Sequence, residues 1–168
     1  MLWGHVLGLD IAEMRGGHKA GSAIFVREFR QRDQALRMKR DVYSGRLKLN
    51  GTEHKETLIA ASNYAISLFY FKSFKEGKKL LRKSILVARR VHGENDEITV
   101  KMRALYAQSL YYDAAATLDD IREAVSTLED AGRIARRVLG GAHPITVGLE
   151  RALRLAQAAH RLSALRSA

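Results

Sequence analysis

The chain has 168 residues, enough for one domain with a sizeable core, and its 46% hydrophobic and 28% charged content is typical of globular proteins. It contains no cysteine, which excludes a disulfide framework, a thiolate metal site and a thiol nucleophile. The formal net charge of +11 favours acidic proteins, nucleic acid or anionic surfaces as partners. No apolar run is long enough to predict a membrane span, and residues 1–10 lack the basic flank of a secretory signal. We therefore expect an intracellular protein, in the cytoplasm or an organelle.

The first 50 residues predict a degenerate helix pair. Residues 34–38 resemble residues 76–80 at a spacing of 42 residues, so a second helix of the pair is expected over residues 33–49. Its partner helix is expected over residues 19–31, after the break at Gly16 and Gly17.

A repeat dominates the rest of the chain. Seven-residue blocks that begin with Gly51, Gly93 and Gly140 each end in threonine, at spacings of 42 and 47 residues. The segment Ala-Arg-Arg-Val also recurs, at residues 88–91 and 135–138. Matched blocks in one register indicate internal duplication, with repeats at 51–92 and 93–139 and a terminal capping helix at 140–168.

Each repeat predicts two helices. In the first, a helix begins near Thr57 and a second follows a capping box formed by Ser73 and Glu76. In the second repeat, Thr117 and Asp120 form the equivalent cap, and five extra residues fall between the two helices. Glycine ends each second helix, and Pro144 begins a last helix that extends to about residue 166. Apolar residues at helical spacing, among them Leu68 and Leu128, are expected in the core.

The segments Asn63-Tyr-Ala, Phe74-Lys-Glu and Val138-Leu-Gly-Gly-Ala-His-Pro-Ile-Thr resemble the long tetratricopeptide repeats of the kinesin light chain type. The resemblance covers residues 51–160 clearly and residues 1–50 weakly, and it departs from the family pattern at Gly77, Asp96-Glu97 and Leu105. It implies an all-α fold, an α-solenoid of antiparallel helix pairs that forms a right-handed superhelix, with no catalytic activity.

The resemblance also implies a concave groove, lined by the first helix of each pair, that binds segments of other proteins. Asn63 is the foremost candidate, because a side-chain amide both donates to and accepts from a peptide backbone. The residues at matched positions are Ile59, Asn63, Ile66 and Tyr70 in one repeat and Lys101, Leu105, Gln108 and Tyr112 in the next.

The sequence favours a binding protein over an enzyme. His54 and His143 occupy the same linker position, which indicates turn residues in preference to metal ligands. Neither an HExxH metal motif nor a phosphate-binding glycine loop is present. We therefore expect no catalytic site, metal or cofactor.

Basic residues gather on the predicted second helices, where Lys48, Arg90 and Arg137 occupy equivalent positions and are expected to form a ladder. One interpretation is a solvated outer face whose arginines interact favourably with the helix dipole. The other is a docking strip for RNA or an acidic protein. The leading function is a scaffold or adaptor that binds an acidic protein or peptide in its groove. The alternative is a basic subunit of a larger assembly that contacts RNA or an acidic protein through its convex face.

Overall fold

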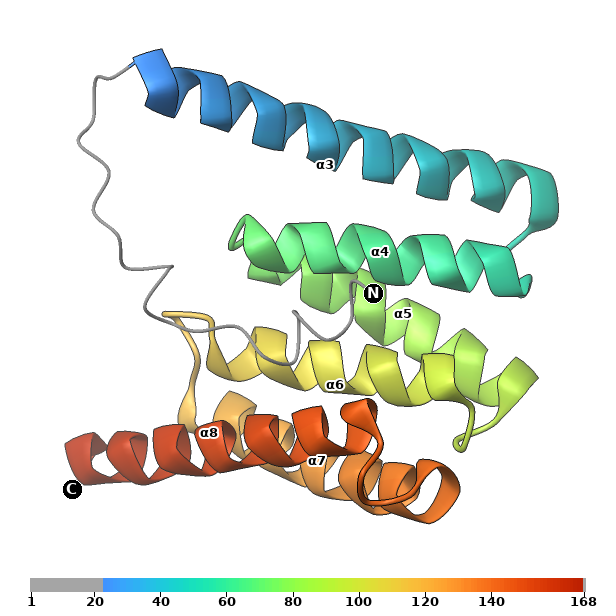
Figure 1. The fold of residues 1–168 in the computed structure, drawn as a ribbon. Coiled ribbons are helices and arrows are strands. Elements are labelled where there is room, and N and C mark those ends of the chain that lie inside the picture. The colour runs from blue at the N-terminus through green and yellow to red at the C-terminus, as the bar shows by residue number, and fades with distance from the viewer. Residues whose placement is uncertain (1–22, 168) are drawn as a thin grey trace.

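A computed structural model describes residues 23–167, and within this range every element is an α-helix, which confirms the all-α prediction (Figure 1). None of the described helices is both long and apolar enough to cross a membrane. The helices are α3 (Ala23–Asn50), α4 (Lys55–Tyr70), α5 (Phe74–His92), α6 (Glu97–Tyr111), α7 (Leu118–Leu139) and α8 (Pro144–Ser167).

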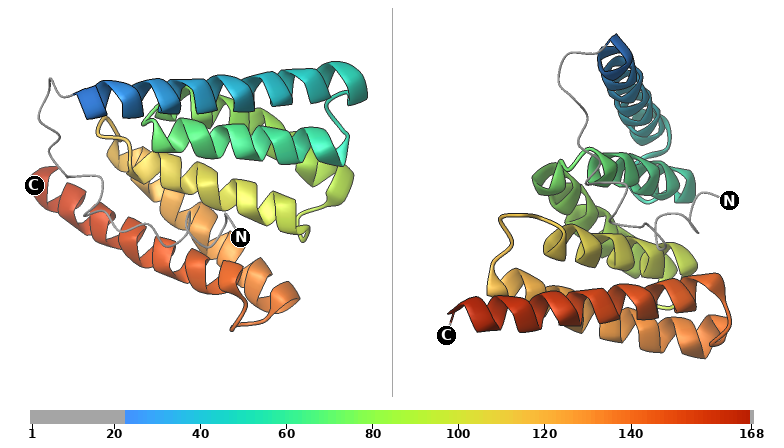
Figure 2. Two further views of the ribbon diagram at one scale, coloured as in Figure 1. Left: turned by 45° about the horizontal axis from the view of Figure 1, so that its top comes forward. Right: turned by 60° about the vertical axis from the view of Figure 1, so that its left-hand side comes forward.

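The helices stack in chain order, and each packs against the helix before and after it (Figures 1 and 2). Contacts between alternate helices join α4 to α6 and α6 to α8, so these three helices form one row. Helices α5 and α7 each pack between two members of that row. The helix pairs α4–α5 and α6–α7 coincide with the two repeats expected at residues 51–92 and 93–139.

Helix α3 differs from its prediction. The sequence predicts one helix over residues 19–31 and another over 33–49, but one continuous helix runs from Ala23 to Asn50. The repeat register places the missing turn at residues 29–31, where the chain has Phe-Arg-Gln and neither glycine nor proline. A helix continues through such residues because nothing there disfavours helical backbone. Residues 1–22 of the predicted first unit lie outside the described residues.

The linkers that precede α4, α6 and α8 share one construction. Gly51, Gly93 and Gly140 follow the preceding helices with φ of 76°, 87° and 89°, in the left-handed region that favours glycine. Three residues later a side chain accepts a hydrogen bond from the backbone of the next helix. His54 accepts from Glu56 N, Asp96 from Ile98 N and His143 from Ile145 N, at 3.2, 2.8 and 3.3 Å. This is the turn role expected for the two histidines.

Of the two predicted capping boxes, one is present. The Thr117 hydroxyl accepts from Asp120 N at 3.1 Å, and the Asp120 carboxylate accepts from Thr117 N at 2.9 Å. Ser73 also precedes a helix, but its side chain makes no capping hydrogen bond, so that prediction is wrong. Its ψ of 53° is far from the extended backbone of Thr117, because it ends a tight turn in which Lys72 has φ of 58°.

The five extra residues of the second pair are divided between a turn and a helix. The α6–α7 turn spans residues 112–117, whereas the α4–α5 turn spans residues 71–73. Helix α7 has 22 residues against 19 in α5, and α6 has one residue fewer than α4.

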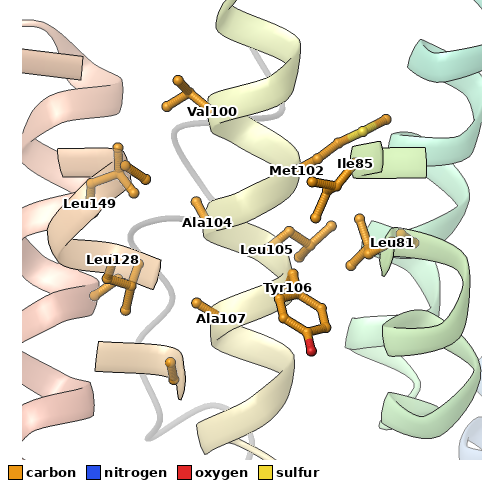
Figure 3. Close-up of a cluster of buried hydrophobic side chains, with 14 of the residues drawn as sticks. Leu81, Ile85, Val100, Met102, Ala104, Leu105, Tyr106, Ala107, Leu128 and Leu149 are labelled. Atoms are coloured by element: carbon orange, nitrogen blue, oxygen red, sulfur yellow. The ribbon is translucent and has the colours of Figure 1, made fainter. Parts of the chain in front are cut away.

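The core is centred on α6, which packs on α4, α5, α7 and α8. Ten of its fifteen residues are buried. One side of α6 faces α5, and the other faces α7 and α8 (Figure 3). Met102, Leu105 and Tyr106 point toward Leu81 and Ile85, whereas Val100, Ala104 and Ala107 face Leu128 and Leu149.

Leu128→Ala should lower the free energy of unfolding by about 2–5 kcal/mol, because the leucine is fully buried between α6 and its neighbours. Chemical denaturation followed by circular dichroism measures this loss. Leu86→Ala is the matched control, since Leu86 is 66% exposed on α5 and its truncation should cost less than about 0.5 kcal/mol. Equal costs for the two variants would contradict the assigned helix faces.

Thr117→Ala should cost about 1 kcal/mol of stability, since it removes a helix cap that has both of its hydrogen bonds. Ser73→Ala occupies the equivalent place in the other pair and should change stability by less than about 0.5 kcal/mol. Thermal unfolding of both variants tests the difference, and a larger loss for Ser73→Ala would contradict it.

Candidate binding groove

A cavity of about 300 Å³ opens between the beginnings of α4 and α6. Three of the predicted groove residues line it: Ile59 and Asn63 from α4 and Lys101 from α6. They come together because α4 and α6 are neighbours in one row. The remaining lining residues are Lys55, Ser62, Asp96, Glu97 and Ile98, which the sequence analysis did not select.

The charged groups of this cavity belong to the helix starts. Asp96 caps α6, and Glu97 in its first turn contacts the Lys101 ammonium one turn later. A carboxylate is stabilised at a helix N-terminus, so both acids fit the local backbone. With Lys55 on the α4 side, the cavity therefore presents two ammonium and two carboxylate groups. Asp96 lies three residues after the linker glycine, as His54 and His143 do, and this recurrent position is the sequence signal that could have identified it as a cap.

Two polar side chains of α4 in this cavity have no internal hydrogen bond. The Asn63 amide is partly exposed and bonds to no group in the described part of the chain. The Ser62 hydroxyl is buried and also lacks a hydrogen-bond partner there. Buried polar groups are normally hydrogen-bonded, so the α4 side of the cavity retains unused capacity for hydrogen bonds.

The two predicted groove tyrosines, Tyr70 and Tyr112, lie at the opposite ends of α4 and α6 from this cavity. The ring of Phe69 is 6.3 Å from Tyr70 and 5.3 Å from Tyr112, edge-on in both cases. Burial raises the pKa of both tyrosine hydroxyls. Tyr112 is partly buried between helices, whereas Tyr70 remains exposed. The predicted groove residues thus form two separate groups.

Gln108 and Leu105 do not line a groove, contrary to the prediction. Gln108 is 2% exposed, and its amide oxygen has no hydrogen-bond partner within the described residues. Leu105 is buried and points toward α5 (Figure 3). Helix α6 has α4 on one side of it in the row and α8 on the other, so these neighbours bury side chains of α6. The side chains at the equivalent positions of α4 stay partly exposed. Ile66, the α4 equivalent of Gln108, is partly buried against the core.

A tyrosine–glutamate hydrogen bond occurs in both helix pairs. Tyr64 donates to Glu76 at 2.6 Å, and Tyr106 donates to Glu123 at 2.7 Å, so each first helix is joined to its second helix in the same way. Burial, followed by the bond to glutamate, raises the pKa of each tyrosine to about 12. Arg82 also donates to the Tyr106 oxygen at 2.6 Å. These tyrosines are structural and do not face the cavity.

The predicted basic ladder makes structural contacts at two of its three positions. Arg90 contacts Glu53, and Arg137 donates to Asn95 at 2.9 Å. In each case the end of a second helix is joined to the third residue of the linker that precedes its pair. Lys48 is exposed and forms no ion pair with the described residues.

A second cavity, of about 420 Å³, lies where the end of α5, α6 and α7 meet. A chain of alternating charges borders it, in the order Arg89, Glu94, Arg103, Asp130, Arg133. The central Arg103 side chain is only 12% exposed and lies 3.4 Å from Glu94 and 3.6 Å from Asp130. Arg137 adds a fourth guanidinium to the lining.

Within the described helices and linkers, no group of three or more histidine, aspartate and glutamate side chains lies close enough together to hold a metal ion. No protein family, curated protein or solved structure matches the chain.

Asp113→Asn should lower the free energy of unfolding by about 1 kcal/mol at pH 7. Lys78 Nζ donates to Asp113 at 2.9 Å, and this bond holds the pKa of the Asp113 carboxyl below its ordinary value of 3.8. A lowered pKa stabilises the fold above pH 3.8, and that stability is lost as the pH falls through the lowered value.

The difference between wild type and Asp113→Asn should therefore shrink on acidification toward pH 2, as measured by urea denaturation across this range. Asp119→Asn is the control, because the Asp119 side chain is exposed and its one ion pair among the described residues is with the exposed Arg122. A difference for Asp113→Asn that does not change with pH would contradict the assignment.

Proposed function

We propose that the protein is a non-catalytic interaction scaffold that binds a peptide or a partner segment along the row α4, α6 and α8. In this proposal the stack is a tetratricopeptide-type α-solenoid with a right-handed superhelical twist. Stacked helix pairs of this kind expose an extended concave surface. The observation that carries the proposal is the cavity between α4 and α6, with the unbonded Asn63 amide in its wall.

The binding chemistry follows from that wall. An extended segment presents backbone N–H and C=O groups, and the Asn63 amide is able to pair with one of each. Lys55 flanks the amide and favours an acidic side chain, whereas Asp96 and the Glu97–Lys101 ion pair disfavour a uniformly acidic segment. A segment that alternates acidic and neutral residues fits this arrangement best. The net charge of +11 accelerates its encounter with the surface.

The Asn63→Ala variant tests the groove. Proteins captured from a native lysate after nuclease treatment supply candidate segments, and synthetic peptides from them are titrated by fluorescence anisotropy. We expect Asn63→Ala to weaken binding about fivefold to tenfold, equivalent to about 1–1.4 kcal/mol, with an unchanged melting temperature. Asn95→Ala is the matched control, since Asn95 bonds to Arg137 outside the cavity. Equal affinity for wild type and Asn63→Ala would reject the groove.

The second candidate function, contact with RNA or an acidic protein through a basic face, is supported by the arginine-lined cavity at α5 and α7. Each of Arg89, Arg103 and Arg133 already contacts a carboxylate there, which reduces the charge available to an anion. Binding through this face predicts a steep loss of affinity between low and moderate salt. Recovery of nucleic acid, with loss of all captured proteins on nuclease treatment, would favour this candidate over the groove.

A further inference from the structure

Helix α3 lies at one end of the stack and packs on α4 (Figure 2). Its covered side carries Leu36, Tyr43 and Leu47, which are partly buried. The Tyr43 ring stacks on Tyr64 of α4 at 6.2 Å between centroids. This contact fixes which side of α3 faces the protein.

The opposite side of α3 carries an apolar stripe. Met38, Val42 and Leu49 are 61%, 55% and 80% exposed, and Ala35 extends the same line toward the N-terminus. Gly45 lies between Val42 and Leu49, so the stripe repeats at alternating steps of four and three residues. That spacing is typical of a seam between two helices, and exposed large apolar groups in such a line indicate a contact surface.

A comparison with α5 and α7, the second helices of the two complete pairs, indicates which neighbour would cover this stripe. Helix α5 packs between α4 and α6, and α7 packs between α6 and α8, whereas the contacts of α3 are with α4. The stripe is therefore placed where a further helix of the α4–α6–α8 row would pack. The repeat register would supply that helix from residues 13–28, but α3 already includes residues 23–28. Among the described residues, no helix in that register covers the stripe.

Charge on the borders of the stripe indicates the kind of helix that fits. Arg32, Lys39 and Arg46 follow one border at steps of seven residues, and all three are exposed with no ion pair among the described residues. The other border carries Asp41 and Lys48. An antiparallel second copy would place the two arginine–lysine rows against each other, which is repulsive. An acidic helix would instead pair with them.

We propose that the outer face of α3 docks an amphipathic helix of another protein, whose apolar seam covers Ala35, Met38, Val42 and Leu49 and whose flanks are acidic. This is the helix-in-groove mode of recognition, in which anchors repeat at three and four residues. The surface is separate from the cavity between α4 and α6 and does not depend on the function proposed for it.

A single thiol tests this proposal in the full-length chain, because the protein has no cysteine of its own. Val42→Cys places the thiol in the stripe, and Leu86→Cys is the matched control at a 66% exposed position on α5. The probes are two synthetic helical peptides of about three heptads with leucine at the seam positions. One carries glutamate on both flanks and the other carries lysine.

We expect the two thiols to react with a chromogenic disulfide at similar rates in dilute protein. The glutamate peptide should slow labelling of Val42→Cys at least tenfold and leave Leu86→Cys unchanged, and the lysine peptide should protect at least tenfold more weakly at the same concentration. Lys39→Glu combined with Arg46→Glu should reverse this preference.

Four outcomes would overturn the proposal. Slow labelling of Val42→Cys at every protein concentration would show that another part of the same chain covers the stripe. Slow labelling only in concentrated protein would assign the stripe to a second copy. Equal protection by the two peptides, or protection of Leu86→Cys, would mean that no acidic helix is recognised at α3.

Discussion

The stack depends on the burial of α6. This helix contacts four others, and ten of its fifteen residues are buried, so only a narrow part of its surface faces water. Alanines at 104 and 107 and the serine at 109 let neighbouring helices approach closely, while Met102 and Leu105 fill the space toward α5. Neither the helices α4 and α5 nor the helices α7 and α8 are able to cover α6 alone. The packing of α4–α5 on one side and α7–α8 on the other is therefore a condition for the fold.

Polar contacts that recur in both pairs orient the helices around this core. The Tyr64–Glu76 and Tyr106–Glu123 bonds join the first helix of each pair to the second. Arg90 and Arg137 connect the end of each second helix to the linker that precedes the first helix of the same pair. The two arginine contacts are exposed, and contacts of that kind contribute little stability individually. Their common positions in both pairs instead favour one relative placement of helix and linker, which is how a duplicated sequence preserves one geometry despite five inserted residues.

Features set by local chemistry were predictable from the sequence, and those set by neighbours were not. The glycine stops, the Thr117 cap and the start at Pro144 each depend on a few adjacent residues, and all are present. Ser73 has a suitable side chain, but a tight turn sets its backbone, which the residue type alone does not reveal. Gln108 matches a groove position by register, yet the packing of α6 between α4 and α8 buries it. Of the eight residues that line the cavity, the register predicted three, Ile59, Asn63 and Lys101, and it did not predict Ser62 or the acids at the start of α6.

The distribution of charge constrains how this protein selects partners. Arginines at 89, 90, 103, 133 and 136 all contact carboxylates, so much of the basic charge is already paired within the protein. Exposed lysines such as Lys75, Lys79 and Lys83 of α5 form no ion pair with the described residues. Scattered ammonium groups on flexible side chains steer an acidic partner but do not distinguish one acidic partner from another. Selectivity has to come from surfaces with shape and direction, which are the amide-bearing cavity between α4 and α6 and the apolar line on α3.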